Sequence, residues 1–254
     1  MFIICLFGFY RNADKKGYNF NIKSDDIKKY IYIPELRNED KNENNPDHLI
    51  SKDFLLTRFG NNTEIELYKY NKQIHLDKCS LEGINIRFNQ FFQQPYRIFS
   101  FFYNVRGCLK MLNDSDINDD NVIILSRIDI GLTLKRNINV IQNHLKENDI
   151  LLGYNSGSTG TEDKWFIFKN KKTLECFINL YDDYGTYINQ YLNKKEGDKV
   201  FEDYPETTRP EDIFPYHFKK YNLKYKFTKR ELLECHFKHV CSPYCGHHKG
   251  RTKT

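Results

Sequence analysis

The sequence has no long apolar run. Its 254 residues contain no stretch that approaches the length of a membrane-spanning helix, which needs about 18 or more apolar residues. The apolar segment Phe2–Phe7 is short, and it lacks both a basic start and a small-residue cleavage site. We therefore expect neither a transmembrane segment nor a signal peptide, and we predict a cytoplasmic protein.

The chain also lacks a paired pattern of cysteines. Seven Cys are present, an odd number, and four of them stand alone within segments that read as regular secondary structure. Small secreted domains carry even numbers of cysteines that form a framework. The pattern here predicts reduced thiols in a cytosolic setting rather than disulfides.

Two phosphate-binding motifs are missing. The glycine-rich segment 153–160 (GYNSGSTG) is not followed by Gly-Lys-Ser/Thr, and no Gly-x-Gly-x-x-Gly follows an apolar strand. These absences exclude a P-loop and leave a dinucleotide-dependent dehydrogenase without support. The net charge of +5 is spread among interspersed acids, without the basic stripe of a nucleic-acid binder. Nucleic acid is therefore not an expected partner.

What the sequence does have is an alternation of short apolar segments with amphipathic ones. The patterns predict strands at residues 2–9, 64–70, 122–125, 150–152 and 223–227. They predict helices at residues 96–112, 140–146, 171–192 and 210–221. This order indicates an α/β fold, a single Rossmann-like domain whose mostly parallel sheet is flanked by helices. We assign it residues 1–230 and treat 231–254 as a basic tail rich in Cys and His.

Residues 121–132 (NVIILSRIDIGL) carry the clearest chemical signal. Four apolar β-formers lead into Arg127 and Asp129, at the end of a strand where α/β sheets bind ligands. Buried charges are costly unless they bind something, and alternate residues of an extended chain point to one side. Asp129 could hold Mg²⁺ or Mn²⁺, and Arg127 could pair with a diphosphate. An internal Arg127–Asp129 salt bridge is the structural alternative.

This segment resembles the strand and Asp-x-Asp element of GT-A-type glycosyltransferases, with Arg127 in place of the first acid. Over roughly residues 1–225 the chain is also similar to a group of viral and bacterial polysaccharide-type transferases. The similarity rests on further motifs in the same order, which are Leu6-Phe7-Gly8-Phe9-Tyr10-Arg11, Ser100-Phe101-Phe102-Tyr103, Asp163-Lys164-Trp165-Phe166 and Pro210-Glu211. The resemblance implies a GT-A-like fold and a nucleotide-sugar donor.

The resemblance also implies roles for residues near the nucleotide. Arg11, beyond the first strand, would contact the nucleotide or its phosphates, although a surface arginine at the sheet end explains it equally well. Ser100 and Tyr103 lie one helical turn apart and share a face, so both could touch the nucleotide. Packing of an aromatic helix face is the alternative for this pair.

Three later residues complete the implied site. Asp163, after the glycine-rich loop, would act as base or orient the acceptor hydroxyl, unless it is a loop or helix-end acid. Trp165 would stack on a sugar ring, with core packing as the alternative. Glu211 would contact the substrate, although an acid at a helix start needs no such role.

The tail holds a second group of candidate ligands. Cys235, Cys241, Cys245 and His247 lie within a short segment, and Zn²⁺ takes four Cys or His ligands. Their spacing is not the usual pair of Cys-x2-Cys motifs, so a basic, thiol-rich tail without metal is the alternative.

Together these features predict a glycosyltransferase that moves a sugar from a nucleotide-sugar donor to a glycan or glycoconjugate acceptor. Asp129 and Asp163 are the predicted catalytic residues, Mn²⁺ or Mg²⁺ the predicted cofactor, and Zn²⁺ a candidate for the tail. The alternative function is a non-catalytic binding or scaffold protein, in which a transferase fold has lost its first metal-binding acid.

Overall fold

The computed structural model describes residues 1–11, 27–37, 46–84, 94–134, 138–154, 161–200, 202–228 and 232–236. The described part excludes the side chains of residues 46, 131, 134, 154, 161–163 and 233–236.

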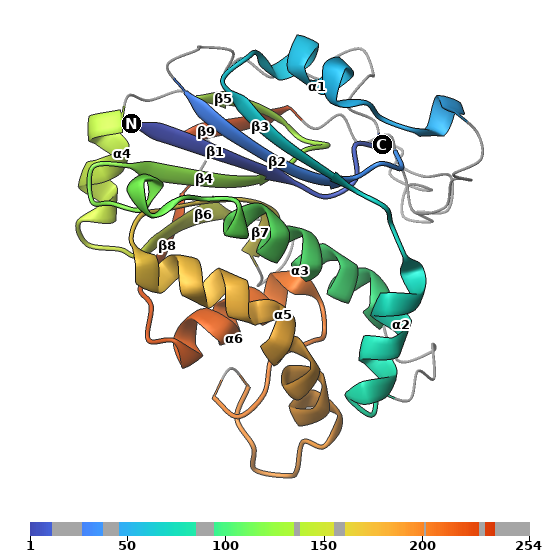
Figure 1. The fold of residues 1–254 in the computed structure, drawn as a ribbon. Coiled ribbons are helices and arrows are strands. Elements are labelled where there is room, and N and C mark those ends of the chain that lie inside the picture. Colours follow the sequence, from blue (N-terminus) through green and yellow to red (C-terminus); the bar gives the residue numbers. More distant parts are fainter. Residues whose placement is uncertain are drawn as a thin grey trace, which may run out of the picture.

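A seven-stranded sheet forms the centre of the molecule (Figure 1). Its strands, in spatial order, are β3 (Thr63–Tyr68), β2 (Lys28–Pro34), β1 (Phe2–Phe7), β4 (Val122–Arg127), β7 (Thr161–Phe168), β6 (Ile150–Tyr154) and β8 (Tyr225–Thr228). Every strand except β7 runs in the same direction. The sheet is therefore mostly parallel, as the sequence predicts.

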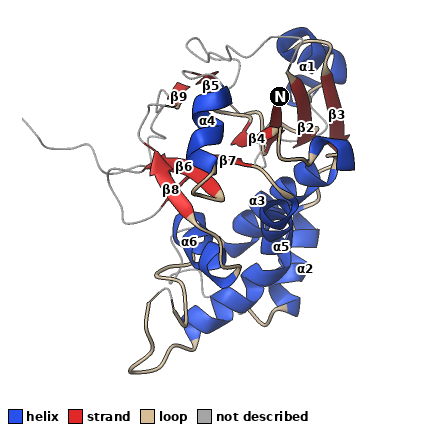
Figure 2. Ribbon diagram, turned by 90° about the vertical axis from the view of Figure 1, so that its left-hand side faces the viewer, coloured by secondary structure: helices blue, strands red, loops and turns tan. Residues whose placement is uncertain are grey.

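Helices cover both faces of this sheet, as the two views in Figures 1 and 2 show. One face carries α2 (Lys72–Leu81), α3 (Pro95–Lys110), α5 (Lys171–Leu192) and α6 (Pro210–Lys220). The other carries α1 (Lys52–Phe59), α4 (Ile138–Leu145) and a small sheet of β5 (Gly131–Leu134) and β9 (Leu233–His236). The short 3-10 turns are η1 (Pro46–His48) and η3 (Asp114–Asp116).

The alternation along β1 explains the two layers. Ile3, Cys5 and Phe7 join the core under α3 and α5, whereas Ile4 and Leu6 join the core under α1 and α4. All five side chains are fully buried. Successive side chains of a strand point to opposite faces, so an apolar run without alternation demands cover on both.

The structure corrects the predicted sheet at three places. The strands at 2–7, 122–125 and 150–152 share one sheet, but β7 lies between β4 and β6. Residues 161–168, for which the sequence pattern predicted no strand, form β7. The run Lys28–Pro34, for which no element was predicted, is the buried strand β2. Cys235, expected in an irregular tail, lies in β9 and pairs with Leu132 of β5.

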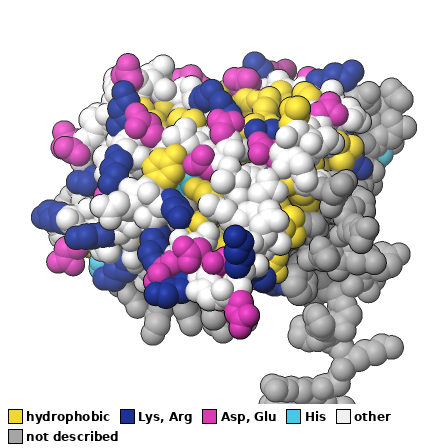
Figure 3. Space-filling model, turned by 90° about the horizontal axis from the view of Figure 1, so that it is seen from below, with side chains coloured by type: hydrophobic (Ala, Val, Ile, Leu, Met, Phe, Trp, Pro, Cys, Tyr) yellow, Lys and Arg dark blue, Asp and Glu magenta, His cyan; other side chains and the backbone are white. Residues whose placement is uncertain are grey.

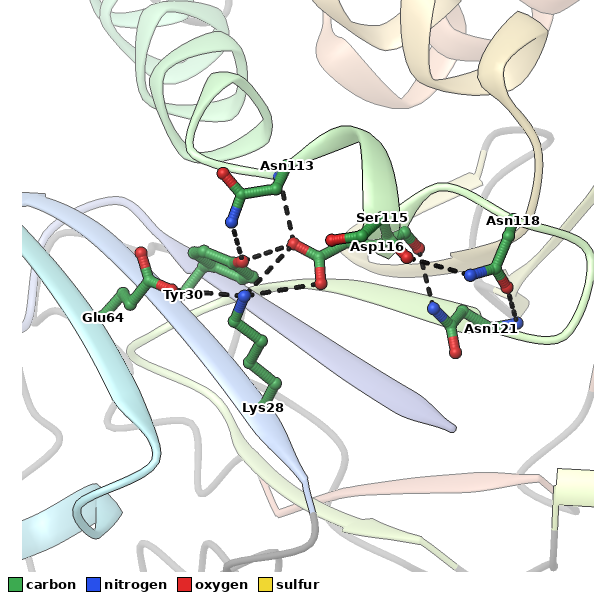
Figure 4. A network of polar contacts seen from close by, with 8 residues as sticks. All are labelled: Lys28, Tyr30, Glu64, Asn113, Ser115, Asp116, Asn118 and Asn121. Atoms are coloured by element: carbon green, nitrogen blue, oxygen red, sulfur yellow. Dashed lines mark hydrogen bonds and ion pairs between the residues drawn. The ribbon is translucent and has the colours of Figure 1, made fainter.

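A polar network closes the edge of the sheet where the parallel strands begin (Figure 4). Asp116 accepts hydrogen bonds from the Tyr30 hydroxyl, from the Asn113 amide at 3.0 Å and from Lys28 Nζ at 3.4 Å. Burial by itself would raise the pKa of Asp116, but these donors outweigh it and hold the pKa below its usual range. The network thus joins β2 to the segment that precedes β4.

Three further features concern the surface charges, the cysteines and the character of the helices. On the face seen from below, acidic and basic side chains are interspersed (Figure 3). Cys5, Cys79, Cys108 and Cys176 are buried, and none of these four is joined in a disulfide. Among the described residues, none of the helices has both the length and the apolar character needed to cross a membrane.

Candidate functional site

The order of strands defines one place where a ligand is expected. From β1 the chain moves outward to β2 and β3, and it then returns to place β4 on the opposite side of β1. In open α/β sheets, ligands bind beyond the carboxyl ends of the strands at such a switch point. The site therefore has to be sought just after Phe7 and around Arg127, which face each other in the β1–β4 register.

The chain leaves β1 through a turn that places an arginine at this edge. Gly8 adopts φ 91°, a left-handed conformation that glycine reaches without a steric penalty. Arg11 follows with φ 22° and an exposed side chain. Its amide donates to the carbonyl of Arg37 at 2.8 Å, which links the end of β1 to the end of β2. Arg11 thus lies at the predicted edge of the sheet.

Strand β4 extends two residues beyond its predicted end and finishes at Arg127. The amide of Ile128 donates to the Phe7 carbonyl at 2.9 Å, and the amide of Ile130 donates back to Arg127 at 3.3 Å. The backbone therefore turns after Arg127, and the expectation of an extended segment at this point is wrong. The turn brings the side chains of Arg127 and Asp129 together instead.

Arg127 and Asp129 form a two-pronged ion pair. Nε of Arg127 lies 3.0 Å from Oδ1 of Asp129, and Nη2 lies 2.8 Å from Oδ2. The Arg127 side chain is 22% exposed and that of Asp129 is 9% exposed. The parallel fork fixes the plane of the guanidinium and keeps its positive charge near the surface. The salt bridge considered from the sequence is therefore present.

Strand β7 brings a third segment to the same edge. Because β7 runs against β4, its beginning lies beside the end of β4, and Ser126 pairs with Trp165. The Ser126 hydroxyl donates to the carbonyl of Lys164 at 3.1 Å. Asp163 immediately precedes Lys164 in β7, so the fold brings its backbone to this edge, while its side chain lies outside the described part.

Three other candidate residues, Trp165, Ser100 and Tyr103, lie in packed surroundings. Trp165 is 3% exposed within the core cluster under α1 and α4, which favours the packing alternative. Ser100 is 1% exposed on α3. Tyr103 packs edge-on against Tyr68 and the ring of His75. The ring contacts favour the packing alternative for Tyr103, whereas the buried Ser100 hydroxyl has no hydrogen-bond partner among the described residues.

Glu211 lies in the first turn of α6, next to Asp212. Its side chain is partly buried. The Thr207 hydroxyl donates to Asp212, and the Arg209 amide donates to the Thr207 hydroxyl at 3.1 Å. Acidic residues at a helix start are stabilised by the helix dipole. The position of Glu211 in the first turn of α6 agrees with the alternative of a helix-end acid.

Sequence reasoning missed Arg37, which follows β2. Its guanidinium carbon lies 5.8 Å from the ring centre of Tyr10 and 5.5 Å from that of Phe54. Since β2 lies beside β1, three adjacent strands each deliver an arginine to one edge, namely Arg11, Arg37 and Arg127. The apolar run Lys28–Pro34, with Arg37 three residues after its proline, is the sequence signal that could have identified this residue.

The predicted metal ligands fall into two groups. Asp129 stays the predicted ligand of Mg²⁺ or Mn²⁺, but both of its oxygens already accept from Arg127. Within the described ranges, no group of three or more His, Cys, Asp or Glu side chains is placed to hold a metal. Cys241, Cys245 and His247 lie outside the described residues, and Cys235 is described only through its backbone in β9.

Comparisons with known proteins give little. No protein-family model matches the chain, and no curated protein matches it. Among solved structures, the chain is similar to mouse xyloside xylosyltransferase 1 in its apo form. The similarity covers 90% of this chain and 84% of that one, at 9% identity and a TM-score of 0.43. Values this low carry no argument about function.

Proposed function

We propose that this chain is a glycosyltransferase that transfers a sugar from a nucleotide-sugar donor to a glycan or glycoconjugate acceptor. The observation that carries the proposal is the arginine edge at the switch point between β1 and β4. There, Arg11, Arg37 and the Arg127–Asp129 pair follow three adjacent strands. An edge of this kind suits a ligand with several negative charges, as the diphosphate of a nucleotide-sugar has.

The chemistry of the transfer explains why such an edge is useful. The bond between the anomeric carbon and the phosphate oxygen breaks, and its electron pair stays on the leaving nucleotide. Fixed positive groups stabilise this growing charge when they are in place before the reaction begins. Arg127 meets that condition because Asp129 holds its guanidinium through two hydrogen bonds.

Asp163 is the residue that we propose activates the acceptor hydroxyl. A carboxylate near the attacking hydroxyl removes its proton as the new bond forms. The beginning of β7 lies beside the end of β4, so the backbone of Asp163 is at the edge where the donor would lie. We assign it the role of base, with the acceptor hydroxyl as the nucleophile.

The second candidate function is a non-catalytic scaffold, and one specific observation favours it. The Arg127–Asp129 pair satisfies both carboxylate oxygens internally, as a purely structural salt bridge would. A scaffold of this type has no need to bind a nucleotide-sugar.

Donor binding and donor hydrolysis separate the two functions. The purified chain is screened by thermal shift with UDP-, GDP- and CMP-sugars, each with and without Mn²⁺, and donor hydrolysis is followed by release of the free nucleotide. A transferase shows stabilisation by at least one donor together with slow hydrolysis of it. Absence of both effects with every donor would favour the scaffold.

A further inference from the structure

The backbone of Arg127 is fixed from both sides of β4. On one side it pairs with Phe7, whose carbonyl accepts from the next amide, that of Ile128, at 2.9 Å. On the other side the preceding residue, Ser126, binds the carbonyl of Lys164 at 3.1 Å. The end of β4 is therefore anchored to both β1 and β7. The Arg127 side chain thus extends from a backbone that is held on both sides.

The guanidinium is fixed as well. Two of its five N–H donors bind the two oxygens of Asp129, at 3.0 and 2.8 Å. Asp129 itself is only 9% exposed, whereas Arg127 is 22% exposed. Of the two side chains, that of Arg127 is therefore the more exposed to solvent.

This arrangement does not fit a divalent cation. A metal bound to Asp129 would have to share oxygens that already accept from a cation, and like charges a few ångströms apart in a partly buried site repel strongly. Mg²⁺ and Mn²⁺ also need several oxygen ligands, commonly from one or two carboxylates and the substrate. Among the described residues, Asp129 belongs to no group of three or more His, Cys, Asp or Glu side chains that could hold a metal ion.

We infer that Arg127 provides the positive charge that a bound divalent cation would otherwise provide, so that this chain transfers sugar without a metal. The inference rests on the proposed function. As the bond between the anomeric carbon and the phosphate oxygen breaks, its electron pair moves to that oxygen, and Arg127 donates hydrogen bonds to the diphosphate. The acceptor oxygen forms the new bond to the anomeric carbon, and its proton passes to the carboxylate of Asp163 and from there to water.

Asp129 has a different part in this scheme. It contacts neither donor nor acceptor, and it acts by holding the guanidinium in the orientation that the diphosphate needs. We therefore regard Asp129 as a positioning residue and Arg127 as the group that touches the substrate.

The test compares metal-free and metal-loaded protein. The wild-type chain is treated with EDTA, freed of the chelator, and assayed for hydrolysis of the donor selected by thermal shift, with and without added Mn²⁺. The same assay is run on Arg127→Ala, Arg127→Lys and the control Arg106→Ala. Arg106 also pairs with an aspartate, since its Nη1 lies 2.9 and 3.0 Å from the two carboxylate oxygens of Asp182, but this pair joins α3 to α5.

The expected result is that EDTA treatment changes wild-type hydrolysis by less than about twofold. Arg127→Ala lowers it at least about a hundredfold, Arg127→Lys retains part of it because the charge is kept and the fork lost, and Arg106→Ala leaves it unchanged. Circular dichroism checks that each variant is folded. The metal-free wild-type measurement needs no variant, so it decides the question even if Arg127→Ala does not fold.

Two results would overturn the inference, and they are distinguishable. If EDTA abolishes hydrolysis and Mn²⁺ restores it, a metal carries the charge, and the proposed function stands while the inference fails. If no donor is bound or hydrolysed with or without Mn²⁺, the proposed function itself fails, and the inference fails with it.

Discussion

The guanidinium of Arg127 binds the carboxylate of Asp129 through two parallel hydrogen bonds, from Nε to Oδ1 at 3.0 Å and from Nη2 to Oδ2 at 2.8 Å. The pair lies where β4 ends beside β1, at the switch point of the sheet. A salt bridge at this place can serve stability or ligand binding, and the two roles give opposite patterns when the carboxylate is neutralised.

Asp129→Asn removes the charge and keeps the shape. We expect the melting temperature to change little and donor hydrolysis to fall at least about tenfold, which corresponds to roughly 1.4 kcal/mol of transition-state stabilisation. The loss should appear mainly in kcat, because Arg127 loses its orientation rather than its charge. Asp129→Glu, which keeps a carboxylate within reach of Arg127, should recover part of the activity. A clear drop in melting temperature with normal donor affinity and turnover would assign the pair to stability alone.

Asp116→Asn tests the opposite edge of the sheet. The variant should lose about 2 kcal/mol of unfolding free energy at pH 7, since it weakens buried hydrogen bonds to a charged group. It should leave donor binding unchanged. Urea unfolding measures the first effect and thermal shift the second.

The Asp116 effect should also depend on pH with a definite sign. Its pKa is lower in the folded than in the unfolded chain, so its contribution is present above the unfolded pKa and disappears as the pH falls through the folded pKa. The difference between wild type and Asp116→Asn should therefore shrink as the pH is lowered from about 6 to about 3. Glu64→Gln is the control, because Glu64 contacts Lys28 from a side chain that is 54% exposed. A difference that stays constant over this pH range would contradict the assignment.

The Tyr32 ring lies so close to Gly107 of α3 that it leaves no room for a side chain there. A Cβ at Gly107 would overlap that ring, whereas a Cβ at Gly185 in α5 would meet only the end of the flexible Glu82 side chain. Gly107→Ala should therefore destabilise the protein by about 1–3 kcal/mol despite the better helix propensity of alanine. Gly185→Ala should cost clearly less. Melting temperatures of the two variants give the comparison, and equal effects would show that Tyr32 moves aside.

The tail prediction is tested by metal analysis. If Cys241 and Cys245 are zinc ligands, protein purified under reducing conditions should contain about one equivalent of zinc, and a Cys241→Ser, Cys245→Ser double variant should contain none. Zinc that persists in the double variant would place the metal elsewhere. Protein without zinc would leave a basic tail that binds no metal.

The sequence by itself determined the layered fold and located two of the strands that lead to the ligand-binding edge, although their exact ends differ from the predicted ones. Apolar runs such as Phe2–Phe7 must be covered on both faces, and glycine or charge marks where they stop, so Arg11 and Arg127 could be placed at the ligand-binding edge. The helix Lys171–Leu192 followed from its spacing of apolar residues, which is a local property.

Only the tertiary structure decided which strands are neighbours and which charges meet. The antiparallel position of β7 between β4 and β6 depends on long-range pairing, which a local pattern does not encode. The turn after Arg127, fixed by the hydrogen bond from Ile128 to Phe7, brings Arg127 and Asp129 together. Burial of Trp165 likewise depends on residues distant in sequence. Strand pairing and side-chain burial arise from contacts that form only when the whole sheet assembles. Strand neighbours are selected by the packing of both faces of the sheet rather than by local propensity.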